Sequence, residues 1–231
     1  MKIMIFTLLC LAGTLANAES HEELIDRAFA SMELNLRDYW AYTETSTDDD
    51  GTSVARHDPR RLEGERWVLA SVDGRAPTED ELEYFDEEKN RCRDGDSDDE
   101  DDNSMSRKSF VEDGSLELLE ETDTHWLFAF KPVAGDEDKA SFLKNVDGTL
   151  RVIKDGHYVG QIRMRNSKPI KPGKGVKLEV FNTQLDFAPI SEGGPALPQT
   201  VDTHVKGRAM LLISFNEKAH IEYSDFQKVV Q

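Results

Sequence analysis

Two segments of the chain carry apolar residues at helical spacing. Residues 20–34 begin with Ser20 and Glu23, a pair that forms a capping box at a helix start, and apolar residues then recur every three or four positions. Residues 78–89 follow Pro77, repeat the capping-box pattern and keep a narrow apolar stripe. We therefore predict an amphipathic helix in each segment.

Most of the remaining chain reads as short strands, several with apolar and polar residues alternating. The predicted strands are 39–45, 52–57, 66–72, 115–121, 125–132, 141–145, 149–154, 158–165, 177–187, 201–206, 208–215 and 219–223, followed by a helical turn at 224–230. Asp-Gly pairs at 50–51, 147–148 and 155–156 favour tight hairpin turns between neighbouring strands. Successive hairpins without long crossovers predict a mainly antiparallel sheet.

Some of these strands are apolar on both faces. Trp126, Phe128 and Phe130 share one face of their strand, while the residues between them are also apolar. Met210 and Leu212 share a face in the same way. Such strands either belong to a core packed under the helices or line an apolar cavity, and the pattern allows both.

The first residues match a secretory signal. Lys2 supplies a positive charge, residues 3–11 are mostly apolar, and small residues lead to a cleavage site after Ala18. The apolar run is too short to span a bilayer. We therefore expect residues 1–18 to be removed and residues 19–231 to form a single exported β-rich domain, which in a Gram-negative cell lies in the periplasm.

The 231 residues carry a net charge of −18, from 46 acidic and 28 basic residues. This charge repels a nucleic-acid backbone, so we expect no nucleic-acid partner. Acidic residues concentrate in residues 93–106, where we expect a disordered, self-repelling loop. Basic residues gather at 163–177, which is either a solvated loop or a contact for that acidic loop or an anionic membrane surface.

Sequence motifs for chemistry are incomplete. Asp94, Asp96 and Asp98 match the first positions of a calcium-binding loop. Asp99 stands where that loop needs glycine and Met105 where it needs glutamate, so only weak calcium screening stays open. The sequence also has no HExxH, G-x-S-x-G, Walker or dinucleotide motif. We predict no catalytic residue, no metal ligand and no cofactor.

Removal of the signal leaves one cysteine, Cys92. A single cysteine cannot form an internal disulfide, so stability must come from the core. The thiol is either incidental or pairs with a cysteine of another chain.

The segments follow one another in a distinctive order. An amphipathic helix precedes an aromatic strand at 39–42 and the segment 54–59, and the chain closes with 207–215 and 221–226. This order resembles that of the outer-membrane lipoprotein carrier and sorting superfamily. The resemblance implies an unclosed antiparallel β-barrel with helices across its open side. It covers most of the mature chain as a layout, whereas residues 78–106 have no evident counterpart in the carriers.

The fold class that we predict is mainly β (α+β), a curved antiparallel sheet or unclosed β-barrel with helices packed on the concave side. The resemblance implies an apolar cleft that holds acyl chains. The candidates for its lining, which could equally form ordinary core, are Trp67, Trp126, Phe128, Phe130, Met210 and Leu212. In the carriers an arginine on a strand locks the lid, and Arg56 or Arg66 could correspond to it.

We therefore expect a non-enzymatic periplasmic protein that binds a lipid or an acylated protein. The alternative is an adaptor or regulator that binds another envelope protein through its acidic surface. Binding that weakens steeply with salt favours the adaptor, and displacement by fatty acid favours the lipid binder.

Overall fold

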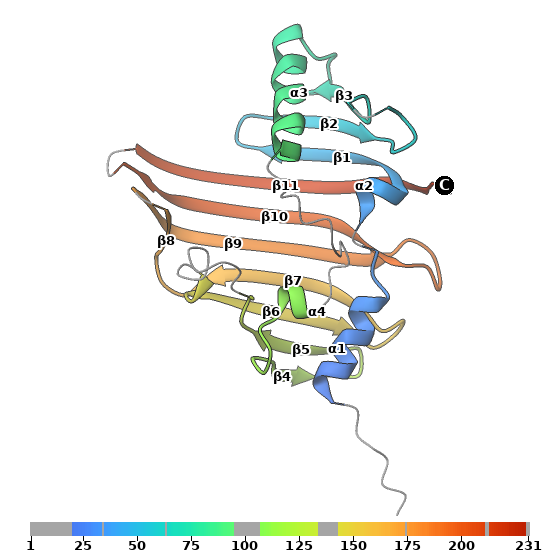
Figure 1. Cartoon of the computed structure of the whole chain (residues 1–231), viewed down its shortest axis with the longest axis vertical. Coiled ribbons are helices and arrows are strands. Elements are labelled where there is room, and N and C mark those ends of the chain that lie inside the picture. The colour runs from blue at the N-terminus through green and yellow to red at the C-terminus, as the bar shows by residue number, and fades with distance from the viewer. Residues whose placement is uncertain are drawn as a thin grey trace, which may run out of the picture.

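One large antiparallel sheet dominates the computed structural model, which describes residues 20–33, 35–62, 64–94, 107–133, 143–173, 175–210 and 213–229. In these residues the strand order is β3-β2-β1-β11-β10-β9-β7-β6-β5-β4, and β8 pairs with β9 beside that path (Figure 1). The strands are β1 (Trp40–Asp48), β2 (Thr52–His57), β3 (Trp67–Val72), β4 (Glu117–Glu121), β5 (His125–Phe130), β6 (Val146–Ile153), β7 (Tyr158–Asn166), β8 (Ile170–Gly173), β9 (Val176–Pro189), β10 (Ala196–Ala209) and β11 (Ile213–Lys228). Because β3 and β4 are separate edges, the sheet is not closed, and the predicted mainly β class is confirmed.

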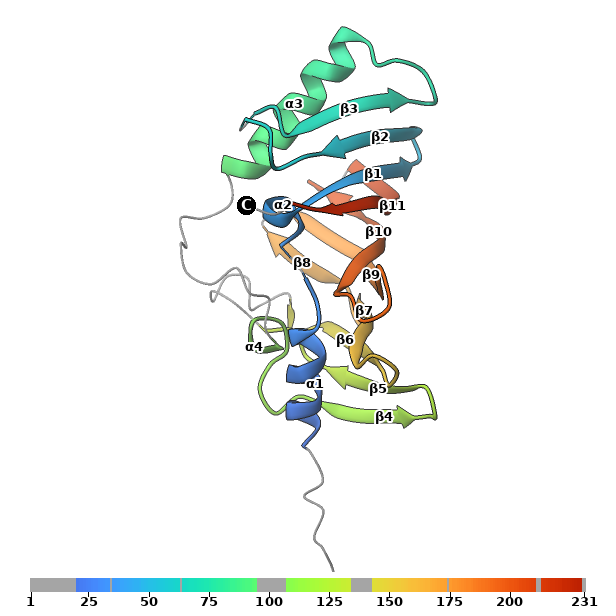
Figure 2. The ribbon, with the colours of Figure 1, turned by 90° about the vertical axis from the view of Figure 1, so that its right-hand side faces the viewer.

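The helices in the described part of the chain are α1 (His21–Ala30), α2 (Leu36–Tyr39), α3 (Glu79–Asp94) and α4 (Arg107–Phe110). They gather on one face of the sheet, called the helix-facing side below (Figure 2). The predicted capping box of α1 is present, because the Ser20 hydroxyl accepts from the Glu23 amide and the Glu23 carboxylate accepts from the Ser20 amide. Thr78 and Glu81 make the same reciprocal pair at the start of α3.

Two hydrophobic clusters hold α1, α2 and α4 to the sheet. In the first, Ile25 and Phe29 of α1 pack against Phe128, Leu150 and Ile162 from β5, β6 and β7. In the second, α2 packs against β1, β10 and the partly buried residues of β3 and β11; its buried members are Leu36, Trp40, Tyr42 and Leu197. The two clusters therefore anchor different parts of the same face.

Several local predictions are wrong. The Asp-Gly pair at 147–148 lies inside β6, because Gly148 pairs with Phe130 on β5 rather than turning. Residues 224–228 continue β11 and pair with β1 instead of forming a helical turn. Residues 143–145 form a turn rather than part of the predicted strand 141–145, and residues 141–142 lie outside the described residues. By contrast, the predicted turns at 50–51 and 155–156 do connect β1 to β2 and β6 to β7.

The predicted signal peptide, residues 1–18, lies outside the described residues. So does most of the predicted acidic loop, since only Arg93 and Asp94 are described, as the last residues of α3. Both therefore stay predictions.

Candidate functional site

The helix-facing side of the sheet carries two sets of apolar residues on its long central strands, separated by the pair Thr183–Thr203. Strand pairing aligns Leu185 of β9 with Val201 of β10, and Val201 with Ile221 of β11. Four residues farther along these strands, Phe181 pairs with Val205. Leu185 packs against the first cluster, so the alternation of strand side chains places all five residues on the helix-facing side. Each of them is half-buried rather than buried.

The described helices leave much of this surface uncovered. They pack mainly on the strands β7, β1 and β3. In Figure 1 the left-hand halves of β9, β10 and β11 carry no helix from the described residues. Glu217, opposite Val205, is exposed in this area, and Thr183 and Thr203 are half-buried there. An apolar surface of this kind, between two packed clusters, is suited to a flexible apolar ligand.

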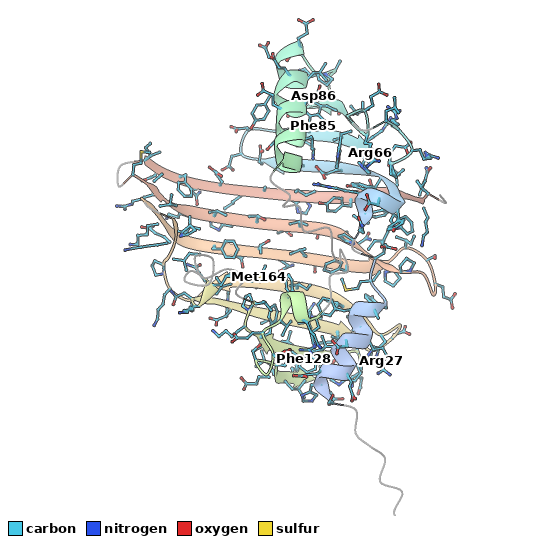
Figure 3. All side chains as sticks on the ribbon, in the orientation of Figure 1. Arg27, Arg66, Phe85, Asp86, Phe128 and Met164 are labelled. Atoms are coloured by element: carbon cyan, nitrogen blue, oxygen red, sulfur yellow. The ribbon has the colours of Figure 1, made fainter. Side chains whose placement is uncertain are left out.

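Four of the six predicted lining residues lie on the helix-facing side, but in two separate places. Phe128 and Phe130 are 0% and 2% exposed beneath α1, and Trp126 packs against the same cluster. Figure 3 shows Phe128 near α1 and Met164 farther toward the middle of the sheet. Trp67 belongs to the second cluster, edge-on to Tyr42. The two phenylalanines are therefore part of the ordinary core. None of the residues that form the half-buried surface between the clusters was predicted.

Met210 does not lie on a strand face. The predicted strand 208–215 is interrupted, because Met210 has φ of 50° in the turn between β10 and β11 and is 77% exposed. Its placement in a cleft lining is therefore wrong. Leu212 lies outside the described residues.

Lys89 attaches α3 to the helix-facing side of the sheet. This role was not predicted from the sequence. Its ammonium lies 3.9 Å from the centroid of the Trp67 ring and 5.5 Å from that of Phe85. It also lies 3.2 Å from a carboxylate oxygen of Glu44 on β1. The available signal is a lone lysine in an acidic helix, four residues after a phenylalanine, at the spacing of one helix face.

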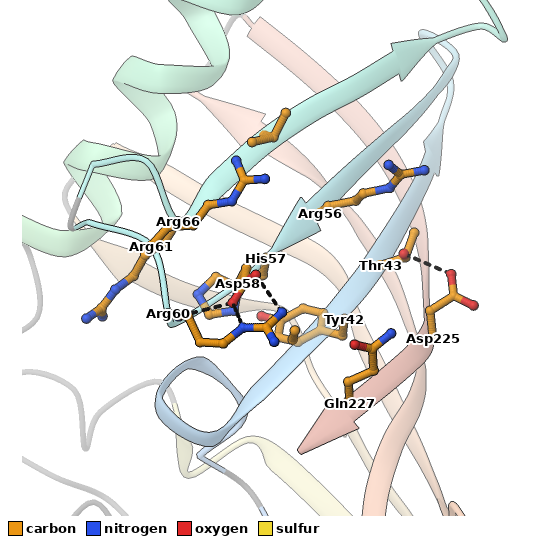
Figure 4. Close-up of a pocket in the computed structure, with 12 residues that line it drawn as sticks. Tyr42, Thr43, Arg56, His57, Asp58, Arg60, Arg61, Arg66, Asp225 and Gln227 are labelled. Carbon is orange, nitrogen blue, oxygen red and sulfur yellow. Dashed lines mark hydrogen bonds and ion pairs between the residues drawn. The ribbon is translucent and has the colours of Figure 1, made fainter. Parts of the chain in front are cut away.

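A pocket of about 400 Å³ lies beside β1, β2 and β11, at the loop that follows β2 (Figure 4). Its lining includes four arginines, Arg56, Arg60, Arg61 and Arg66. In the same lining, Asp58 holds Arg60 through two contacts of 2.8 Å, one from Nε and one from Nη2. This pair holds the pKa of Asp58 down, at about 2.

Arg56 and Arg66, the predicted lid-locking candidates, both line this pocket. Arg56 lies between Ala55 and His57, which are buried on the helix-facing side, so its side chain projects from the opposite side. Arg56 and Arg66 form no ion pair within the described residues, whereas Lys89 of α3 contacts Glu44 and the Trp67 ring at this end of the sheet. This arrangement does not support the prediction that Arg56 or Arg66 locks a lid.

His57 forms the inner wall of the pocket. Its Nδ1 lies 3.2 Å from the Trp40 carbonyl oxygen, which only accepts, so Nδ1 carries the hydrogen of this bond. Its ring centroid is 5.1 Å from Tyr42 and 4.8 Å from Trp67. Burial lowers the pKa of His57, the Trp40 bond opposes this, and the charges of Arg37 and Arg66 lower the pKa further.

Other kinds of site find no support in the part of the chain described here. No group of three or more His, Cys, Asp or Glu side chains within it could hold a metal ion. Among these same residues, no helix has the length and apolar character needed to cross a bilayer.

Comparison with protein-family models, with curated proteins and with solved structures gives no match. The functional argument therefore rests on the geometry of this chain alone.

Proposed function

We propose that this protein binds the acyl chains of a lipid or an acylated protein on the helix-facing side of its sheet and catalyses no reaction. The observation that carries the proposal is the half-buried apolar surface of Phe181, Leu185, Val201, Val205 and Ile221. These residues lie between the two clusters and extend past the described helices.

The energetics favour a long apolar ligand. Each methylene that leaves water for an apolar surface contributes about 0.8 kcal/mol. Binding must also offset the loss of ligand freedom, which a chain of many methylenes can do and a small molecule cannot. Thr183 and Thr203, which lie between the pairs Phe181–Val205 and Leu185–Val201, bond to each other through their hydroxyl groups. The surface therefore selects for apolar length rather than for a particular head group.

A second feature indicates how such a ligand could arrive from a membrane. The Met210 amide donates to the Gly175 carbonyl at 2.7 Å, which brings the β10–β11 turn beside the β8–β9 connection. Met210 and Ile213 are 77% and 61% exposed there, and Lys171 and Lys177 are exposed beside them. Apolar side chains at a tip with lysines around it suit an anionic lipid surface. We propose that this corner meets the membrane, with part of the basic stretch 163–177.

Displacement of a fluorescent fatty acid by unlabelled palmitate tests the acyl-binding proposal. The Val205→Glu variant places a charge on the apolar surface and should abolish binding. His204→Glu places the same group on the neighbouring residue of β10, which faces the other side, and should bind like the unmodified protein. Circular dichroism checks that both variants fold. Absence of binding in the unmodified protein, or equal binding in both variants, would contradict the proposal.

Salt separates this function from an electrostatic one. Burial of an acyl chain should change little between about 50 mM and about 500 mM salt, because the screening of charges does not weaken apolar contact. A steep loss of binding over this range would indicate that the probe is held by charge, which contradicts acyl binding at this surface.

A further inference from the structure

The arginine pocket lies apart from the apolar surface and has its own chemistry. Arg56, Arg60, Arg61 and Arg66 meet there in a protein whose net charge is −18. Arg60 is paired with Asp58. Arg56, Arg61 and Arg66 form no ion pair with any residue of the described chain. Three unpaired guanidinium groups around one pocket repel one another, and a bound anion would remove that cost.

Strand register fixes two of these arginines on the same side of the sheet. Arg56 pairs with Val68 across β2 and β3. The Asp58 amide donates to the Arg66 carbonyl at 2.9 Å, which places Arg66 opposite Asp58, two positions from Val68. Arg56 and Arg66 are therefore diagonal neighbours, and Figure 4 shows both guanidinium groups on the same side of the two strands.

Arg66 also carries a hydrogen-bond donor without a partner. Its Nε is buried, and no acceptor from the described residues reaches it. A buried donor left unpaired is costly, and a small shift of the Arg66 side chain toward the pocket would let a ligand oxygen satisfy it. Arg60 is held in place by its two contacts with Asp58, so one side of the pocket is already ordered before a ligand binds.

These groups favour a particular anion. One arginine is enough to bind a carboxylate through two parallel bonds, whereas the three or four oxygens of a phosphate can accept from several guanidinium groups that line one pocket. A volume of about 400 Å³ exceeds that of a bare phosphate and leaves room for an attached group. Asp225, on the far rim, accepts from Thr43 at 3.0 Å and would repel a second anionic group there. The phosphoryl group would therefore lie on the arginine side.

We propose that this pocket binds a phosphate group, free or esterified, through Arg56 and Arg66, with Arg61 and the ordered Arg60 beside them. The site is on the side of the sheet opposite Val205, so it goes beyond acyl binding and does not depend on it.

Isothermal titration calorimetry with inorganic phosphate, at constant ionic strength in a chloride buffer, tests the proposal. Arg66→Gln and Arg56→Gln should each weaken binding about tenfold or more, since each removes a charge-assisted contact. Arg165→Gln removes an exposed arginine from β7 on the same side of the sheet and should leave binding unchanged. Thermal melts followed by circular dichroism confirm that the variants fold, and Arg56→Gln, on an exposed side chain, is the variant expected to keep the fold in any case.

Two further titrations distinguish the source of the phosphate. Glycerol phosphate and a soluble short-chain phosphatidylglycerol replace inorganic phosphate, and each is repeated with Arg66→Gln. Binding of inorganic phosphate and glycerol phosphate indicates a free phosphate or a phosphomonoester. Binding of the short-chain phosphatidylglycerol alone indicates a lipid head group. Either result supports phosphate binding in this pocket if Arg66→Gln weakens that binding as expected. The proposal is overturned if none of the three ligands binds, or if binding is the same in Arg66→Gln and Arg165→Gln. The Val205→Glu variant should bind phosphate normally, so failure of the acyl proposal is separate from failure here.

Discussion

Lys89 of α3 stands over the ring of Trp67 on β3, with its ammonium 3.9 Å from the ring centroid. The same ammonium lies 3.2 Å from Glu44 on β1, so a single side chain connects the helix to two strands. Among the other apolar side chains described in α3, Phe85 is half-buried, whereas Leu82 and Tyr84 are 41% and 63% exposed. The attachment of α3 therefore depends strongly on this one charge.

The Lys89→Met variant should loosen α3 while leaving the sheet folded. Loss of the cation–π contact and of a half-buried ion pair should cost about 1–2 kcal/mol locally. Amide hydrogen exchange in residues 79–94 should then be roughly 5 to 30 times faster, with little change in β9 and β10. Glu88→Met, on the exposed neighbouring residue, is the matched control. Unchanged exchange in Lys89→Met would show that other contacts hold the helix.

The Met210→Glu variant should weaken binding to anionic vesicles. It replaces an apolar side chain at the tip with a charge that anionic lipid repels, and co-sedimentation with phosphatidylglycerol vesicles should fall about tenfold or more. Glu192→Gln, in the exposed turn after β9, tests whether any change of surface charge has this effect. Equal sedimentation of Met210→Glu and the unmodified protein would show that this corner is not the membrane contact.

The Gly148→Ala variant should destabilise the fold. A Cβ at Gly148 would lie 2.3 Å from the Phe130 ring, which is too close for either group to stay in place. Displacement of a buried phenylalanine in a packed core should cost about 1–3 kcal/mol of unfolding free energy, measured by urea unfolding. Thr149→Ala, at the next residue and on the other face, should cost less. Similar losses in the two variants would mean that the ring moves aside freely.

Gly148 also illustrates which parts of the fold the sequence could predict. Alternating patterns, two capping boxes and two true Asp-Gly turns were sufficient for an open antiparallel sheet with helices. The third Asp-Gly pair looked like a turn, but Phe130 on the adjacent strand covers the glycine and keeps it in β6. That contact is long-range, so a local pattern could not reveal it.

The candidate site was harder to predict for a related reason. Phe128 and the other aromatic residues attracted attention because they are large, yet large apolar residues are the ones that pack first beneath a helix. The half-buried surface consists of ordinary residues such as Val201 and Val205, whose exposure depends on where helices end. The arginines of residues 56–66 form a basic group in an acidic half of the chain, which charge patterning alone could have found.

His57 should make stability depend on pH just below neutrality. The ring is 3% exposed, and burial holds its folded-state pKa below the ordinary value of 6.5. As the pH falls through 6.5, the unfolded chain takes up a proton that the folded ring does not, so the unfolded state is favoured. The stability from this residue is therefore complete above pH 6.5 and decreases as the pH falls toward the lower, folded pKa.

Urea unfolding at a series of pH values between 6.5 and 5 measures this effect. One proton can contribute a slope of at most about 1.4 kcal/mol per pH unit. His57→Gln keeps a donor for the Trp40 carbonyl but does not titrate, so its slope should be smaller than that of the unmodified protein. His220→Gln removes an exposed histidine that lies 2.8 Å from Asp202, and it tests whether the loss of any histidine has this effect. The carboxylates of Asp58 and Glu81, each with a pKa of about 2, lose their contribution only in more acidic solution. An unchanged slope in His57→Gln would therefore mean that the buried ring takes up its proton as readily in the folded protein as in the unfolded chain.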